Sequence, residues 1–142
     1  MDREYTEKLL RTTGSAATKE VSAPQTVLHA AFDAIIQGNF DAFGESVTED
    51  VELNISGFGE LDGSWRGRDA VVAATRKNFA RVGEQKPEIE SMISEGDRIA
   101  VLLRENGVFK ASGRAYSVRG VQWFTFAEGK IKKIDEIIAT TS

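Results

Sequence analysis

The two parts of this chain follow different hydrophobic periods, and this division constrains its fold most. Residues 22–83 contain three segments whose apolar side chains recur at helical spacing, with one alternating stretch at Val51–Ile55 between them. From Lys86 onward, β-branched and aromatic residues form runs separated by turn signals, which predicts about four successive antiparallel strands. Helices followed by a strand meander indicate the α+β class, in which helices pack on one face of a curved sheet.

Boundary residues define the three helical segments. Ser22 and Gln25 have capping-box spacing before the first segment, and Gly38 can end it. Asn39 can cap a short second helix, and Asp69 suits the helix dipole in the first turn of the third. The apolar face of the first segment consists of Leu28, Ala31, Phe32, Ile35 and Ile36.

Turns and loops are marked by small and polar residues. Turn signals divide the strand region at Glu95–Asp97, Glu105–Gly107, Ala111–Gly113 and Ala127–Gly129. Gly57–Gly67 is predicted to be a glycine-rich loop that holds Trp65. This loop is not a phosphate cradle, because the lysine and hydroxyl spacing of a P-loop is missing.

Residues 1–21 differ from the rest of the chain. Their small and polar stretch at Thr12–Thr18 is typical of linkers, so we interpret them as a mobile N-terminal arm. The alternative is a short helix at Tyr5–Arg11 that docks on the domain or on a partner subunit. Residues 22–142 are predicted to form a single domain, which suits a chain of 142 residues.

The residue counts exclude several kinds of site. A chain without cysteine has no thiol nucleophile and no cysteine-ligated metal, and the single His29 excludes His-rich metal centres. We therefore expect no metal and no cofactor. The net charge of −4 argues against a general nucleic-acid or membrane-surface binder, and no stretch approaches the ~18 apolar residues of a membrane helix. A cytoplasmic location is favoured.

Three stretches resemble signatures of a known superfamily. They are Ile36–Phe43 after the first helix, Trp65–Val71 at the entry to the third helix and Gly129–Glu136 in the last strand. Their order and spacing are similar to those of the nuclear transport factor 2-like superfamily, particularly its SnoaL-like and ketosteroid-isomerase-like members. The resemblance covers residues from about 22 to 142.

This resemblance implies a cone-shaped barrel of a curved, mainly antiparallel sheet with about three helices packed on its concave face. It also implies a conical cavity between sheet and helices, open at one end. Enzymes of the superfamily include isomerases, dehydratases, polyketide cyclases and epoxide hydrolases, which work through acids and bases in the pocket. The fold also serves non-catalytic roles.

The resemblance to steroid isomerases can be followed residue by residue. Their pocket tyrosine would lie at Ala31, their proton-shuttling carboxylate at Ile55 and their oxyanion-hole acid near Gln122. These three departures count against steroid isomerisation, because an isoleucine cannot act as a base. The two-histidine dehydratase pattern is excluded by the single His29.

The resemblance to limonene-type epoxide hydrolases is closer over the last strands. Arg98 occupies the position of their catalytic arginine and Glu136 that of one of their two aspartates. Ala100 stands where the other aspartate should be. Only two of the three groups are therefore in place.

Glu136 is the leading catalytic candidate. Strand alternation places it on one face with Ile134 and Ile138, and a carboxyl group among isoleucines should have a raised pKa that suits acid/base catalysis. The alternatives are that the strand register is shifted by one residue, or that Glu136 pairs with a cross-strand arginine or lysine. Gln122 could orient a ligand carbonyl, and Arg98 could polarise the substrate or simply face solvent.

Two further surfaces follow from the same alternation. The cavity walls are predicted to be mostly apolar, which favours a small hydrophobic ligand, and to comprise Leu53, Ile55, Trp65, Ala100, Leu102, Phe124, Ile134 and Ile138. Trp123 is predicted to face outward near Val121, which suits a homodimer interface on the outer sheet face. His29 and Asp33 could pair on the first helix, although their position beside the apolar stripe favours the surface.

Two functions therefore remain open. One is a cofactor-independent enzyme that acts on a small hydrophobic molecule by isomerisation, dehydration, cyclisation or epoxide opening. The other is a non-catalytic module that binds a ligand in the pocket or dimerises through its sheet.

Overall fold

The structure is a computed structural model that describes residues 22–141. These residues form three helices and six strands, with the helices in the first part of the chain as the sequence predicts. In chain order they are α2 (Ala23–Ile36), α3 (Phe40–Glu45), β1 (Val47–Ser56), β2 (Gly63–Arg66), α4 (Arg68–Arg81), β3 (Val82–Glu95), β4 (Arg98–Phe109), β5 (Ala115–Ala127) and β6 (Lys130–Thr140). The predicted arm at residues 1–21 lies outside the described residues.

The caps of the first two helices are formed by the residues that the sequence indicates. The Ser22 hydroxyl accepts from the Gln25 amide at 3.3 Å, and the Gln25 side chain accepts from the Ser22 amide at 2.7 Å, which completes a capping box. Gly38 follows α2 with a φ of +73°, which favours glycine. The Asn39 side chain then accepts from the Ala42 amide at 3.1 Å and caps α3.

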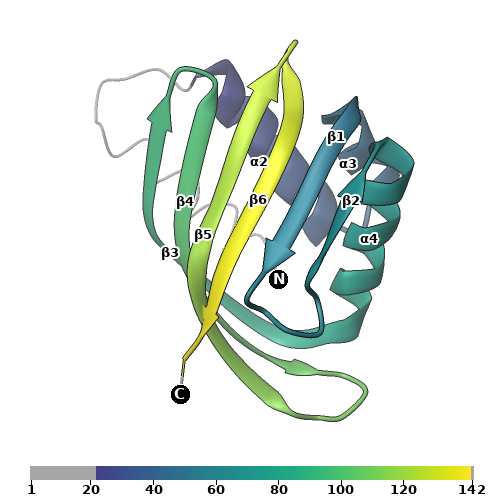
Figure 1. Cartoon of the computed structure of the whole chain (residues 1–142), viewed down its shortest axis with the longest axis vertical. Coiled ribbons are helices and arrows are strands. Elements are labelled where there is room, and N and C mark those ends of the chain that lie inside the picture. The colour runs from purple at the N-terminus through teal and green to yellow at the C-terminus, as the bar shows by residue number, and fades with distance from the viewer. Residues whose placement is uncertain (1–21, 142) are drawn as a thin grey trace.

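The six strands form one open sheet in the order β2-β1-β6-β5-β4-β3 (Figure 1). β1 and β6 pair in parallel, whereas every other neighbouring pair is antiparallel. The parallel pair places the last strand between the first strand and the meander. Residues far apart in sequence consequently stand side by side at the centre of the sheet.

Two local predictions are wrong. Glu105–Gly107 is not a turn but part of β4, which continues to Phe109. Trp65 does not lie in a loop but in β2, where it pairs with Leu53 of β1 and packs against the main core. The predicted turns at Glu95–Asp97, Ala111–Gly113 and Ala127–Gly129 do connect the strands of the meander.

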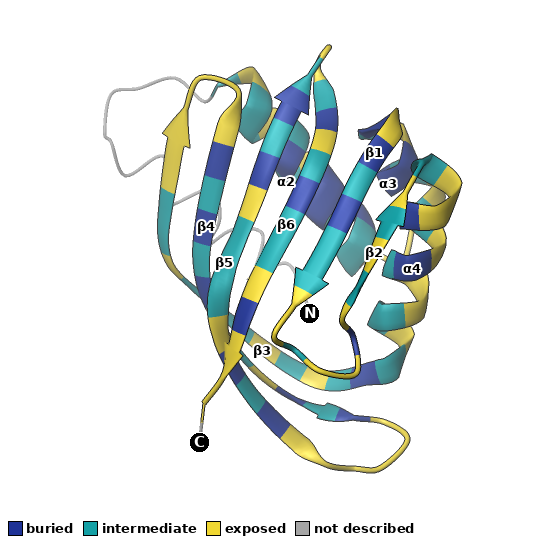
Figure 2. Ribbon diagram, in the orientation of Figure 1, coloured by how far each residue is buried: buried dark blue, intermediate teal, exposed yellow. Residues whose placement is uncertain are grey.

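The sheet is curved, and the three helices lie across its concave side (Figure 1). Irregularities in strand pairing between Gly83 and Lys86, and between Ile89 and Ser91, interrupt the ladder of β3 and favour bending. The main core consists of buried side chains from the helices and the sheet, and Figure 2 marks buried residues on both. A second, smaller core occupies the curled end of the sheet and consists of Leu61, Val82, Phe109, Tyr116, Val118 and Ile138.

No helix among the described residues is long and apolar enough to cross a membrane.

Candidate functional site

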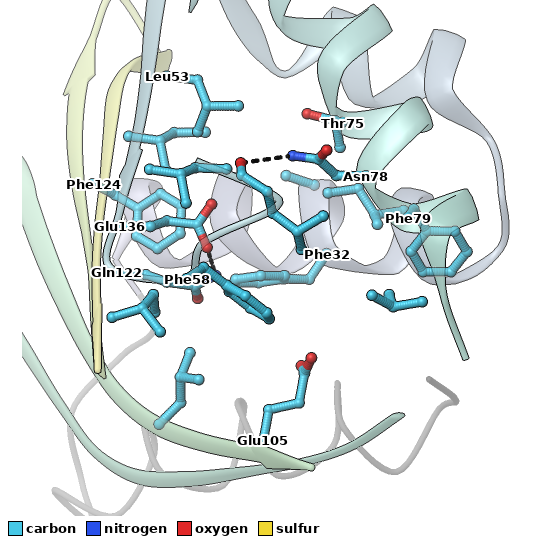
Figure 3. A pocket seen from close by; sticks show the side chains of 18 of the residues that line it. Phe32, Leu53, Phe58, Thr75, Asn78, Phe79, Glu105, Gln122, Phe124 and Glu136 are labelled. Atoms are coloured by element: carbon cyan, nitrogen blue, oxygen red, sulfur yellow. Dashed lines mark hydrogen bonds between the residues drawn. The ribbon is translucent and has the colours of Figure 1, made fainter. Parts of the chain in front are cut away.

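A pocket of about 180 Å³ lies between the helices and the concave face of the sheet (Figure 3). Seven of the predicted site residues line it, two of them polar: Glu136 and Gln122. The other five form apolar wall, namely Leu53, Ile55, Phe124, Ile134 and Ile138. Helices α2 and α4 complete the wall from the opposite side.

Strand register places three of these residues in one row across the sheet. Ile55 of β1 pairs with Glu136 of β6, and Glu136 pairs with Gln122 of β5. Paired residues on neighbouring strands point to the same face, which here is the pocket face. The row therefore runs from Ile55, the position that the resemblance assigns to the isomerase base, through the carboxyl group of Glu136 to the amide of Gln122.

Glu136 and Gln122 are joined by a hydrogen bond. Gln122 Nε2 donates to Glu136 Oε1 at 3.0 Å, as the dashed line in Figure 3 shows. The other end of the amide, Gln122 Oε1, is buried and has no hydrogen-bond partner among the described residues. Gln122 thus positions the carboxyl group, and it retains an unpaired acceptor and the second N–H of its amide.

Burial raises the pKa of Glu136, and the bond from Gln122 only partly opposes this effect. The charge of a second carboxyl group, Glu105, also raises this pKa. A raised pKa brings a carboxyl group closer to neutral pH, where it can both accept and return a proton. The arrangement is therefore suited to acid/base chemistry.

Glu105 is a functional candidate that the sequence analysis missed. It lines the same pocket from β4. Its Oε2 accepts a bond of 2.5 Å from the Tyr116 hydroxyl and one of 3.3 Å from Gln85 Nε2. Burial raises the pKa of Glu105, and it also raises that of Tyr116, which keeps the hydroxyl a donor. The pocket thus contains two carboxyl groups, and each is held by a neutral side chain.

Gly107 explains why Tyr116 can reach Glu105. Gly107 and Tyr116 are paired on β4 and β5, and a Cβ added at Gly107 would lie 2.5 Å from the tyrosine oxygen. The ring therefore crosses the strand where there is no side chain. In the structure Glu105 continues the inward alternation of Val101 and Leu103, but the sequence carries no signal that shows which face of β4 is inward.

Four other predicted site residues do not line the pocket, contrary to expectation. Ala100 and Leu102 face the outer side of the sheet, because β4 turns its buried residues Ile99, Val101 and Leu103 toward the core. Arg98, at the start of β4, is exposed on that same outer side. Trp65 belongs to the core beneath α4.

His29 and Asp33 do not form a pair directed at the pocket. Asp33 accepts a bond from Gln37 Nε2 at 3.0 Å, and neither residue lines the pocket. Within residues 22–141, no three His, Cys, Asp or Glu side chains gather in a way that could hold a metal ion.

An open curved sheet with helices over a pocket defines the class of cone-shaped, nuclear transport factor 2-like proteins. Residues 28–134 match the SnoaL-like domain, and the chain belongs to this family. A comparison with curated proteins finds no match.

Solved structures share the fold at low sequence identity. A nuclear transport factor 2-like protein from Burkholderia xenovorans LB400 is 23% identical with a TM-score of 0.73, over 84% of this chain and 92% of that one. A protein of ketosteroid isomerase-like fold from Catenulispora acidiphila DSM 44928, in complex with trimethylamine, is 14% identical with a TM-score of 0.64, over 78% and 82%. TerC, co-crystallised with polyporic acid, is 17% identical with a TM-score of 0.67, over 82% and 91%.

Proposed function

We propose that this protein is a cofactor-independent acid/base enzyme that acts on a small hydrophobic molecule, of the isomerase, dehydratase, cyclase or epoxide-hydrolase type. One observation carries the proposal: the Glu136 carboxyl group stands in an apolar pocket, held by Gln122, with its pKa raised by burial. Glu136 would take a proton from the substrate and return it, while Gln122 fixes the direction of its carboxylate.

The size and lining of the pocket support a small substrate. A cavity of about 180 Å³ is close to the ~150 Å³ that holds a benzene molecule, so it suits one ring with a short side chain. Of the two ligands named for structural neighbours, trimethylamine is within this size, whereas polyporic acid is larger. A multi-ring polyketide would need a larger cavity.

A non-catalytic ligand-binding module is the second candidate. It is favoured by the apolar side chains at Ala31 and Ile55, where the isomerases carry a tyrosine and a carboxylate, and by the outward direction of Ala100 and Arg98. In that case the pocket would bind the same kind of molecule without changing it.

Turnover separates the two candidates. Small enones and epoxides would be incubated with the wild type and with Glu136→Gln, which removes the charge but retains the shape. The enzyme proposal expects kcat to fall by about 10²–10⁴-fold in Glu136→Gln. Glu88→Gln, an exposed change of the same kind on β3, is the control and should leave turnover unchanged. Binding without turnover in the wild type would contradict the enzyme proposal and favour the module.

We also infer that the protein is a homodimer through its outer sheet face. Three large apolar side chains are exposed there, with accessible fractions of 39% for Trp123, 62% for Ile137 and 67% for Ile93. Register places Ile93 beside Ala100 and Ala100 beside Trp123, so the apolar surface is continuous across three strands. Such a surface favours burial against a second copy.

A further inference from the structure

The polar side chains of the pocket face it mainly with oxygen acceptors. Among the described residues that line the pocket, none is lysine, arginine or histidine. Its polar members are Thr75, Asn78, Gln85, Glu105, Gln122 and Glu136. The hydrogen-bond partners of these six residues decide what a ligand must offer.

On the helix side, two side chains donate to backbone carbonyls. The Thr75 hydroxyl donates to the carbonyl of Val71 at 2.8 Å, within its own helix. Asn78 Nδ2 donates to the carbonyl of Leu61 at 3.4 Å. For a ligand, both side chains retain oxygen lone pairs, and Asn78 also retains the second N–H of its amide.

On the sheet side, the two glutamine nitrogens donate to the two carboxyl groups. Gln85 Nε2 is bonded to Glu105, and Gln122 Nε2 is bonded to Glu136. The buried Gln122 Oε1 has no partner among residues 22–141. An unsatisfied buried acceptor is unfavourable unless a ligand donates to it.

None of the described residues that line the pocket gives the two carboxyl groups a positive partner, while the charge of the N-terminus lowers the pKa of Glu105. Neither Glu105 nor Glu136 forms an ion pair among the described residues, and Figure 3 shows both side chains directed into the same cavity. A buried carboxylate without a cation is costly, and two that repel each other are more so. One positive charge in the cavity would offset both.

The aromatic lining suits such a charge. Phe32, Phe58 and Phe124 line the pocket, and the Phe58 ring lies 5.2 Å from that of Tyr116, the donor to Glu105. Aromatic faces attract organic cations, and they do so most when water is excluded. Glu105 is the better anchor of the two carboxyl groups, because two donors fix the position of its Oε2.

We propose that the ligand of this pocket is a small lipophilic amine in its protonated form, whose ammonium group donates to Glu105 while its apolar body extends toward Glu136. The proposal rests on the proposed function in one respect: Glu136 remains available for proton transfer. A neutral molecule of the same shape would leave the charge of the carboxylates uncompensated, and an anionic molecule would be repelled by them.

Matched ligands test the charge preference directly. Phenylethylamine, phenylethanol and phenylacetate share a ring and a chain but are cationic, neutral and anionic near neutral pH. Isothermal titration calorimetry with the wild type should give an affinity for the amine at least about tenfold above that for the alcohol. The acid should bind most weakly of the three.

Substitutions locate the anchor. Glu105→Gln removes the charge and retains an oxygen that can accept from Tyr116, so it should reduce the affinity for the amine to that for the alcohol. Glu88→Gln, with the same change on the exposed part of β3, should retain the preference. Glu136→Gln should also retain most of the preference for the amine, independently of its effect on turnover.

Either of two results would overturn the proposal. One is an amine that binds no more tightly than the alcohol, which includes the case in which neither binds. The other is an amine preference that survives Glu105→Gln. Binding is measured without turnover. A protein that prefers the amine but catalyses no reaction would contradict only the enzyme proposal, and one that turns over a substrate without this preference would contradict only the inference about the amine.

Discussion

Glu136 on β6 lies directly beside Ile55 on β1, although the two residues come from opposite ends of the described chain. Ile55 is the position that the resemblance to steroid isomerases assigns to their proton-shuttling carboxylate. Neighbouring strands are about 4.8 Å apart, so the Glu136 carboxyl group stands one strand away from Ile55 and faces the same cavity.

The pH dependence of turnover follows from this environment. Burial raises the pKa of Glu136 above its ordinary value of 4.5. A general base works in its ionised form, so kcat/KM should rise as pH passes through the raised pKa. The measurement is a pH profile of kcat/KM for the wild type and for Gln122→Leu.

The bond from Gln122 lowers the pKa of Glu136, because it favours the ionised form. Gln122→Leu should therefore shift the rising limb to higher pH without abolishing it. A limb that stays in place would show that the amide does not act on the carboxylate. A profile that falls over the same range would assign Glu136 the role of an acid.

The contact between Gly107 and Tyr116 should control the second carboxyl group. Tyr116→Phe removes a donor from buried Glu105 and should lower the free energy of unfolding by about 1–3 kcal/mol. Gly107→Ala places a Cβ against the tyrosine ring and should cost about 1–3 kcal/mol through overpacking. Both values would come from urea denaturation.

The double variant Gly107→Ala/Tyr116→Phe tests whether both substitutions destabilise the protein by disturbing the same hydrogen bond to Glu105. Gly107→Ala already displaces the hydroxyl from Glu105, so Tyr116→Phe should cost less in that background than alone. Simple addition of the two effects would mean that Gly107 does not hold the tyrosine in place.

The helices and their boundaries could be predicted from the sequence because their signals are local. The Ser22–Gln25 capping box and the Asn39 cap depend on residues within one helical turn, and both are present in the structure. The order of the helices and of the longer strands likewise follows from local periods, whereas the short strand β2 was expected to be a loop.

The inward face of β4 could not be predicted, because both of its faces are apolar. Ala100 and Leu102 alternate with Ile99, Val101 and Leu103, and hydrophobicity alone does not decide which set turns toward the core. The face is decided by packing, because the helices cover the larger side chains of Ile99, Val101 and Leu103. On β6, by contrast, Ile134 and Ile138 were assigned to the pocket together with Glu136, and all three line it.

Glu105 was missed for a different reason. The sequence Asn106-Gly107 is a strong hairpin signal when read locally. Here the glycine lies within a strand, where the ring of Tyr116 crosses it from the neighbouring strand. That contact depends on the register of β4 and β5, which is not a local property of the sequence.

Stability should change with pH in a direction opposite to that of most carboxyl groups. The pKa of Glu136 is raised in the folded state, so between 4.5 and the raised pKa the folded state holds a proton that the unfolded state has lost. The free energy of unfolding should therefore fall as pH rises through this window. The measurement is urea denaturation from about pH 4 to about pH 8.

Glu136→Gln is the control for this dependence. The variant has no proton to lose, so its free energy of unfolding should fall less across the same window, and at neutral pH it should exceed that of the wild type. A parallel decline in both proteins would place the dependence elsewhere in the chain.

The outer sheet face yields the last prediction. Trp123 is exposed on β5, with Ile137 on neighbouring β6 and Ile93 on β3, beyond β4. Trp123→Glu introduces a charge that would have to be desolvated in the interface, so it should convert a dimer into a monomer by light scattering. Ala30→Glu adds the same charge at an exposed position on α2, away from the sheet, and should leave the mass unchanged. A wild type that is monomeric, or a Trp123→Glu variant that remains dimeric, would contradict the interface.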